Sequence, residues 1–208
     1  MRRLVKLQPH ARSSHWRAAP AVPRWCGALL GAVLLVAAPA AATTVVLLDD
    51  DALVARAVAI VHGDVVGKRC ARTPDGRIFT EYRFAIREML KGEAPPSGVV
   101  SFREWGGELD GLRYWIPGTG RFEIGDEVIV FLGATDATTA VGFTTGLAQG
   151  KFRVVRNARG ARAIRQLGTL VTIDEESGEP VAHAERDEHD LEALLARIRA
   201  RVRGERGR

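Results

Sequence analysis

The first 42 residues contain no aspartate or glutamate, although they carry six basic residues. Behind this positive start come an apolar run, Cys26–Ala38, and the small residues Ala40–Ala42. A basic start, an apolar run and small residues at the end form the pattern of an export signal. We therefore predict a signal peptide over residues 1–42 and a periplasmic or extracellular protein. The apolar run is short for a spanning helix, and membrane anchoring by an uncleaved leader is the alternative.

Beyond residue 42 the chain also lacks an excess of positive charge. The whole chain has a net charge of +5, but six of its 30 basic residues precede residue 43, so 24 remain against all 25 acidic residues. Proteins that bind nucleic acid neutralise its phosphates with a basic patch or stripe. The body of this chain has none, and the sequence predicts that nucleic acid is not a partner.

Cysteine is scarce as well, because the chain has only Cys26 and Cys70. Removal of the leader would leave Cys70 alone, and one cysteine cannot form an internal disulfide. The domain must therefore be stabilised by its hydrophobic core. We interpret Cys70 as a small core residue rather than a reactive thiol, and an intermolecular disulfide is the alternative.

Motifs that carry catalysis are missing from the sequence. The histidines after the leader, His62, His183 and His189, lie outside any zinc-ligand spacing, and no serine lies in a Gly-x-Ser-x-Gly elbow. The run Asp49–Asp51 suits the start of a helix better than a metal site. We therefore expect no enzyme, no metal and no cofactor. The alternative is an enzyme that uses acidic residues, which carboxylates around one pocket, one with a strongly raised pKa, would favour.

Alternating hydrophobicity predicts β-strands through most of the chain. In the clearest strand, residues 78–87, every second side chain faces a core: Ile78, Thr80, Tyr82, Phe84 and Ile86. Further strands are expected at 58–66, 99–105, 112–116, 127–132, 141–147, 151–155 and 161–165. Gly63 is expected to mark a bulge, and His62 and Asp64 to form a surface pair on one face. The strands are too close together for crossover helices, which excludes a parallel sheet.

Helices are expected only near the two ends of this region. The aspartates at 49–51 can cap a short helix over residues 52–57. A second helix is indicated by apolar residues at helical spacing: Leu191, Leu194, Leu195, Ile198 and Val202. Asp187 or Asp190 can cap it, and Gly204 is expected to end it. We expect this arginine-rich helix to pack on the sheet, and binding to a lipid surface is the alternative.

Many short strands with helices only at the edges predict a mainly β fold, a small barrel or a sandwich. We assign residues 43–182 to this β-barrel domain and residues 183–208 to a C-terminal helix and basic tail. No internal repeat or low-complexity tract divides the chain further.

The candidate binding surface is the glycine- and aromatic-rich segment between two predicted strands. The residues proposed to carry it are Trp105, Gly106, Gly107, Tyr114, Trp115 and Phe122. Aromatic side chains give a large contact area, and loops on a rigid barrel commonly hold binding sites. The alternative is that these aromatics fold back and close one end of the barrel.

The order of these features resembles that of the netrin-like modules, which include the tissue inhibitors of metalloproteinases, and of similar uncharacterised exported bacterial proteins. The likeness rests on a short helix followed by the strands Ala57–Val65, Thr80–Gly92 and Gly125–Leu132, the second of which ends in a Lys-Gly step. It implies an OB-like five-stranded barrel and a protein-binding function. Those inhibitors present an N-terminal cysteine to a protease metal. This chain has no cysteine at the start of its predicted mature part, so no inhibitory residue carries over.

Taken together, the sequence predicts an exported, non-catalytic binding module. Its partner is expected to be a protein or a component of the cell envelope. Besides the enzyme considered above, an oligosaccharide-binding barrel is the other alternative, and it would need exposed aromatics with polar neighbours. A membrane is expected as a partner only through an uncleaved leader or a lipid-binding C-terminal helix.

Overall fold

The computed structural model describes residues 43–133 and 142–207, so the predicted signal peptide lies outside the described residues. The helical elements are α2 (Asp50–Arg56), α3 (Leu191–Arg206) and the short 3-10 helix η1 (Leu147–Gly150). The strands are β1 (Thr43–Val46), β2 (Ala59–Arg72), β3 (Ile78–Lys91), β4 (Val99–Leu109), β5 (Leu112–Trp115), β6 (Glu127–Leu132), β7 (Lys151–Asn157), β8 (Gly160–Gln166), β9 (Leu170–Ile173) and β10 (Arg186–Asp190).

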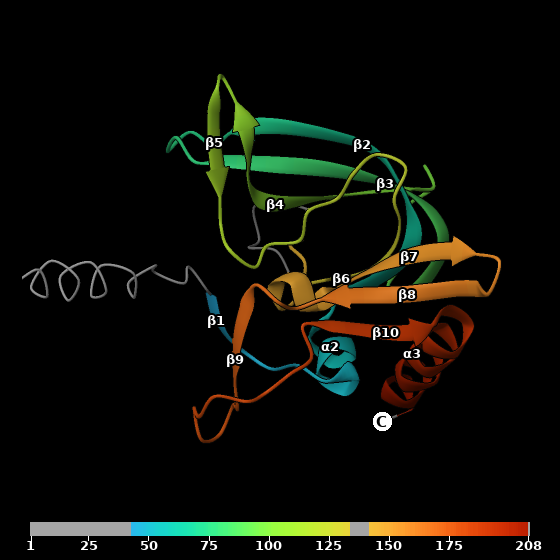
Figure 1. The fold of residues 1–208 in the computed structure, drawn as a ribbon. Helices are drawn as coiled ribbons and strands as arrows, with labels where there is room; N and C mark the ends of the chain where they lie inside the picture. The colour runs from blue at the N-terminus through green and yellow to red at the C-terminus, as the bar shows by residue number, and fades with distance from the viewer. Residues whose placement is uncertain (1–42, 134–141, 208) are drawn as a thin grey trace, which may run out of the picture. The chain divides into compact units, whose positions relative to one another are not determined.

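Eight of these strands form one antiparallel sheet in the order β10-β8-β7-β6-β2-β3-β4-β5. The sheet curls strongly into a half-barrel, with α3 packed outside it (Figure 1). The prediction of a mainly β fold with a C-terminal helix is thus confirmed. The closed OB-like five-stranded barrel is wrong, because the edge strands β5 and β10 each pair with one neighbour and do not meet.

The curl begins in the long hairpin of β2 and β3, each 14 residues long. Their pairing shifts register at three places, one of them between His62 and Gly63. A bulge bends its strand and increases the local twist, so the predicted bulge at Gly63 is confirmed and helps to explain the curl. A Cβ atom at Gly63 would lie 2.3 Å from the carbonyl oxygen of Ala85, so only glycine fits here without a shift.

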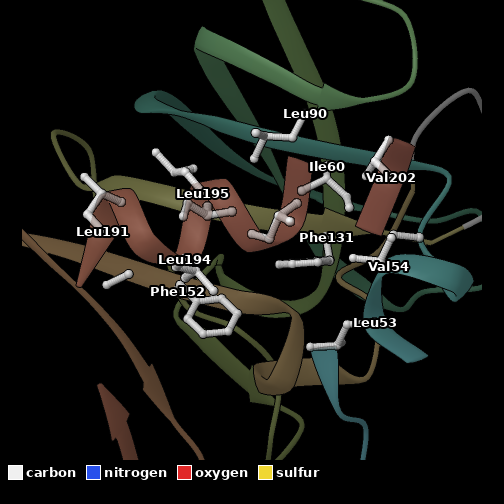
Figure 2. Close-up of a cluster of buried hydrophobic side chains, with 14 of the residues drawn as sticks. Leu53, Val54, Ile60, Leu90, Phe131, Phe152, Leu191, Leu194, Leu195 and Val202 are labelled. Atoms are coloured by element: carbon white, nitrogen blue, oxygen red, sulfur yellow. The ribbon is translucent and has the colours of Figure 1, made fainter. Parts of the chain in front are cut away.

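Both faces of the sheet are buried at its centre, as the continuous apolar run of β6 predicts. Ile129 and Phe131 join an outer core beneath α2 and α3, which Figure 2 shows from close by. Val128, Val130 and Leu132 point to the other side and join an inner core inside the curl. The sheet is therefore the middle layer between the helices and the inner core.

The C-terminal helix α3 covers the outer face. All five residues predicted to face the core are buried: Leu191, Leu194, Leu195, Ile198 and Val202. The carboxylate of Asp190 caps the helix by accepting from the Ala193 amide at 3.0 Å. The helix continues through Gly204 to Arg206, so the predicted end at Gly204 is wrong.

Three arginines of α3 are used inside the fold. Arg199 forms a two-bond ion pair with Glu88 of β3, at 2.6 and 2.7 Å. Arg197 pairs with Asp50 and Arg201 with Asp51, both in the first turn of α2. These contacts support the packed arrangement over the lipid-binding alternative, because they hold much of the helix's charge against α2 and β3.

Two local predictions fail for reasons of tertiary structure. Strand β1 pairs in parallel with β9, from Thr43 beside Leu170 onward, which the sequence argument excluded. That argument considered strands that are neighbours in the sequence, whereas seven of the eight strands of the large sheet lie between β1 and β9 along the chain. The strand expected at 141–147 is also absent from residues 142–147: only Thr144 bridges to Leu132, and left-handed conformations at Gly146 and Leu147 turn the chain into η1.

Candidate functional site

A cavity of about 360 Å³, the first cavity, opens between β2, β3, β4, β5 and the segment that follows β5. Five of the six predicted binding residues line it: Trp105, Gly106, Gly107, Tyr114 and Trp115. Its volume lies in the range of small-ligand pockets, roughly 300–1,000 Å³. The segment singled out from the sequence therefore lies beside a real depression in the surface.

The aromatic residues of this segment divide between surface and core. Tyr114 and Trp115 are 42% and 45% exposed, and both lie on β5. Trp105 is half-buried, with its ring stacked on Phe143 at 5.5 Å. Phe122 is fully buried in the inner core and does not line the cavity. Tyr114 and Trp115 are thus exposed on β5, while Phe122 folds back into the core, and binding by this segment stays a prediction.

The glycines Gly106 and Gly107 have a structural role at the wall of the cavity. A Cβ atom at Gly107 would lie 2.5 Å from Thr80 Oγ1 and 2.7 Å from the Cys70 sulfur. Thr80 Oγ1 donates to the Gly106 carbonyl at 2.7 Å. Gly107 therefore lets β4 lie close to Cys70 of β2 and Thr80 of β3, both of which line the cavity. Gly106 instead allows a close approach to β5, since a Cβ atom there would lie 2.8 Å from the Tyr114 carbonyl oxygen.

Strand β5 is joined to β4 by a tight turn at Asp110 and Gly111, which was not predicted from the sequence. Asp110 and Gly111 both have positive φ, 53° and 74°, between the paired residues Leu109 and Leu112. An Asp-Gly pair in two-residue hairpins is a strong sequence signal, since both central residues need positive φ. That signal could have predicted the β4–β5 hairpin directly.

Glu104 is the most unusual residue of the cavity wall. Its side chain is on β4 and only 3% exposed, and one carboxylate oxygen accepts from the Thr144 amide at 2.8 Å. Burial raises the pKa of Glu104 to about 7, because the charged form loses its hydration. The sequence held a hint of this residue, since Glu104 shares the alternation of Val100 and Phe102, which face the inner core.

The other two carboxylates of the first cavity are exposed and paired. Glu108 accepts from Arg113 at 3.0 Å, and Glu123 pairs with Lys68. Glu104 thus supplies a raised pKa in a carboxylate-lined pocket, the feature that would favour an acid–base enzyme. The exposed rings of Tyr114 and Trp115 with these charged neighbours meet the condition set for a sugar ligand.

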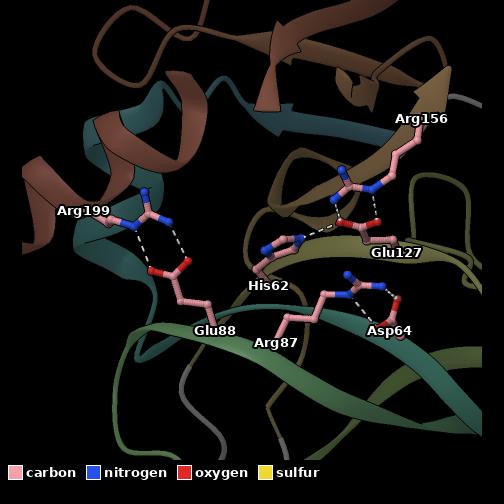
Figure 3. A network of polar contacts seen from close by, with 7 residues as sticks. All are labelled: His62, Asp64, Arg87, Glu88, Glu127, Arg156 and Arg199. Atoms are coloured by element: carbon pink, nitrogen blue, oxygen red, sulfur yellow. Dashed lines mark hydrogen bonds and ion pairs between the residues drawn. The ribbon is translucent and has the colours of Figure 1, made fainter. Parts of the chain in front are cut away.

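A second group of charged residues forms an ion-pair network on β2, β3, β6 and β7 (Figure 3). His62 lies 2.8 Å from Glu127, which also accepts two bonds from Arg156 at 2.6 and 2.8 Å. The Arg156 guanidinium is the main reason why the pKa of Glu127 is lowered to about 2. Asp64 pairs instead with Arg87, at 2.7 and 3.0 Å.

The predicted surface pair of His62 and Asp64 is therefore wrong. His62 is 7% exposed, and its partner comes from the neighbouring strand β6, where Glu127 stands opposite Asp64. No residue of this network lines the first cavity. We interpret it as a structural tie between strands.

Within residues 43–133 and 142–207, no group of three or more His, Cys, Asp or Glu side chains is placed to hold a metal ion. Among the helices of the same residues, none is long and apolar enough to span a membrane.

Comparisons of the chain with protein-family models, with curated proteins and with solved structures found no match. The resemblance to netrin-like modules thus stays a prediction, and the function is argued from the geometry of the site.

Proposed function

We propose that this chain is an exported binding module that takes up an extended segment of a partner protein along the edge strand β5. The observation that carries the proposal is the exposure of β5: all four of its side chains are exposed, three of them apolar or aromatic (Leu112, Tyr114 and Trp115). An exposed sheet edge with unpaired backbone groups is a template for an added strand.

The opposite edge of the sheet supports this assignment by contrast. Strand β10 carries charged side chains that form ion pairs, with Glu188 between Arg162 and Arg186 at 3.1 and 2.9 Å. Charged side chains are a common protection of edge strands against unwanted pairing. Strand β5 carries only one such charge, Arg113, and its other three side chains are apolar or aromatic, which is expected of an edge that receives a partner.

The hairpin geometry indicates which backbone groups a partner strand would meet. In a two-residue hairpin the pair beside the turn, here Leu109 and Leu112, closes the ladder, and hydrogen-bonded pairs then alternate. The backbone groups of Arg113 therefore point away from β4, toward an added strand. Side chains of that strand would alternate, and those on one face would reach the first cavity.

The test removes the outward amide of β5 while leaving its pairing with β4 intact. Random peptides displayed on phage would be selected on the full-length protein, and an enriched peptide titrated by calorimetry. Arg113→Pro is expected to weaken its binding about tenfold or more, because the new residue has no N–H. Proline is tolerated on an edge strand where the N–H faces solvent, so the fold should be kept.

Arg113→Ala is the matched control, because it removes the same side chain and keeps the amide. Its affinity should stay within about threefold of wild type, as for an exposed side chain whose ion pair contributes little. Equal loss in both variants, or enrichment of no peptide, would contradict strand addition. Circular dichroism of both variants checks that the sheet is unchanged.

Acid–base catalysis is the second candidate function, and the buried carboxyl of Glu104 is the observation that favours it. An acid with a pKa near the working pH can both give and take a proton. A panel of nitrophenyl esters and glycosides would be tested with wild type, Glu104→Gln and Glu108→Gln. Turnover lost only in Glu104→Gln would support catalysis, whereas no turnover by wild type would count against it.

A further inference from the structure

A second cavity, of about 590 Å³, lies beside the first, against β7, β8 and the segment that joins β5 to β6. The two cavities share one wall, which includes Trp115, Arg121 and Glu123. The second is distinct in its other walls, which come from strands that the first cavity does not reach. It is large enough for a small organic molecule.

One part of this cavity is apolar. Val155 of β7 and Ile164 of β8 line it, and so do Ala148 and the ring of Trp115. The alternation of β7 explains the arrangement, because Phe152 and Val154 face the outer core while Lys151, Arg153 and Val155 alternate with them and line the cavity. An apolar ligand body would find contacts here.

The rest of the lining is rich in cations. Arg121, Lys151, Arg153 and Arg186 line the cavity, against the acids Glu123 and Asp126. Arg153 is compensated by Asp126 at 3.4 Å, and Arg186 by Glu188 at 2.9 Å.

The other two cations have no carboxylate within 4.0 Å among the residues that the structure describes. Each lies over an aromatic ring instead: the Arg121 guanidinium is 4.8 Å from the Trp115 ring centroid, and the Lys151 ammonium is 4.3 Å from that of Phe122. A ring face holds a cation in place without neutralising it.

Lys151 is also substantially desolvated. Burial lowers the pKa of Lys151 to about 8, against the opposing effect of the nearby carboxylates. The charged groups that face it are Asp126 and Glu123 from the joining segment, Arg153 from β7 and Glu104 from β4. A bound anion would favour the charged form of this lysine, so binding and protonation are coupled.

We infer that the second cavity is a binding site for a small amphiphilic organic anion. Arg121 and Lys151 bind its anionic group, and Val155 and Ile164 contact its apolar body. The second cavity includes Trp115 of β5 in its wall, but this inference does not depend on strand addition.

The experiment compares two dyes that share their ring system, the anion anilinonaphthalene sulfonate and the neutral N-phenylnaphthylamine. The full-length protein is titrated with each, and dissociation constants are read from dye fluorescence. Wild type is expected to bind the sulfonate about tenfold more tightly than the neutral dye. Lys151→Met and Arg121→Gln should each weaken sulfonate binding by a similar factor and leave the neutral dye unchanged.

Arg159→Gln is the control, because it removes one positive charge from the exposed turn between β7 and β8. It should bind both dyes as wild type does. The affinity of wild type for the sulfonate should also fall as the pH rises above about 8, where Lys151 loses its proton, and this fall should be absent in Lys151→Met.

Three results would overturn the inference. Wild type could fail to bind the sulfonate, or bind both dyes equally, which would indicate an unspecific apolar surface. Alternatively, Lys151→Met and Arg121→Gln could bind the sulfonate as tightly as wild type does. Circular dichroism in the aromatic region distinguishes a lost site from a loosened fold, since sulfonate dyes also bind partly unfolded proteins.

Discussion

At about pH 8 the variant Glu104→Gln is expected to be more stable than the wild-type protein by about 3 kcal/mol. The reason is the burial of Glu104, which raises its pKa from the ordinary 4.5 to about 7. Ionising this buried carboxyl costs free energy in the folded protein. In the unfolded chain the same carboxyl is hydrated, and its ionisation carries no such cost. Glutamine has no charge and can still accept from the Thr144 amide through its own oxygen.

The sign of the pH dependence follows from proton binding. Between about pH 4.5 and 7 the folded protein holds a proton on Glu104 that the unfolded chain has released, so the stability of wild type falls as the pH rises through this window. Below about pH 4.5 the advantage of Glu104→Gln should therefore vanish. Thermal unfolding at both ends of the window measures it, with a shift of roughly 6–12 °C expected at the upper end.

Glu108→Gln is the matched control on the same strand. Its side chain is exposed and paired with Arg113, so the stability should change by about 0.5 kcal/mol or less at either pH. An advantage of Glu104→Gln that did not vary with pH would contradict the ionisation argument. Such a result would mean that packing, rather than charge, sets the difference between the two side chains.

Gly63→Ala is expected to lower the free energy of unfolding by about 3 kcal/mol. Its Cβ atom would lie 2.3 Å from the Ala85 carbonyl oxygen and 3.2 Å from the carbonyl carbon. Both atoms belong to the backbone of β3, so relief requires the paired strands to separate at the bulge. Urea unfolding followed by circular dichroism measures the change.

Gly67→Ala, four residues along the same strand, separates this clash from the general cost of replacing a strand glycine. A Cβ atom there would meet only the Arg83 side chain, at 3.7 Å, which is an ordinary contact. We expect a change of about 1 kcal/mol or less for this variant. If the two variants were equally destabilised, the close approach at Gly63 would not be the cause.

The strands were largely predictable because apolar and polar side chains alternate along their sequences. Ile78, Tyr82 and Phe84 alternate toward the interior, and they are buried as expected. The helix α3 was equally readable, since Leu194 and Ile198 repeat with the period of a helix and both are fully buried. These patterns are local, and they predict an element correctly when that element buries one of its faces.

Closure of the sheet was not predictable by the same means. A curled sheet closes into a barrel only when its two edge strands come close enough to pair. The sequences of β5 and β10 do not indicate how far apart these edges lie. The parallel pairing of β1 and β9 is also invisible to a local reading, because Thr43 and its partner Leu170 are far apart in the sequence. Long-range pairing is specified by the assembled fold.

The candidate site was predictable in part. The aromatic segment was found from its composition, and Trp115 lies in the walls of both cavities. Lys151 and Arg121 were missed because a lone cation in a sequence full of cations carries no signal. They stand out because each lies over an aromatic ring and neither has a carboxylate partner among the described residues. Both features are visible only in the three-dimensional structure.

The parallel strand pair has a consequence for the order of events during folding. Strand β1 is the first part of the described chain to be made, yet its partner β9 follows only after the eight-stranded sheet is nearly complete. Contacts between segments so distant along the chain form late, because their closure entropy is offset only when the intervening structure is in place. Gln149, whose side chain bonds to the backbone of Val46 and Leu48, must also be positioned first. The segment nearest the predicted cleavage point is therefore expected to dock last, and to be the first to detach when the domain begins to unfold.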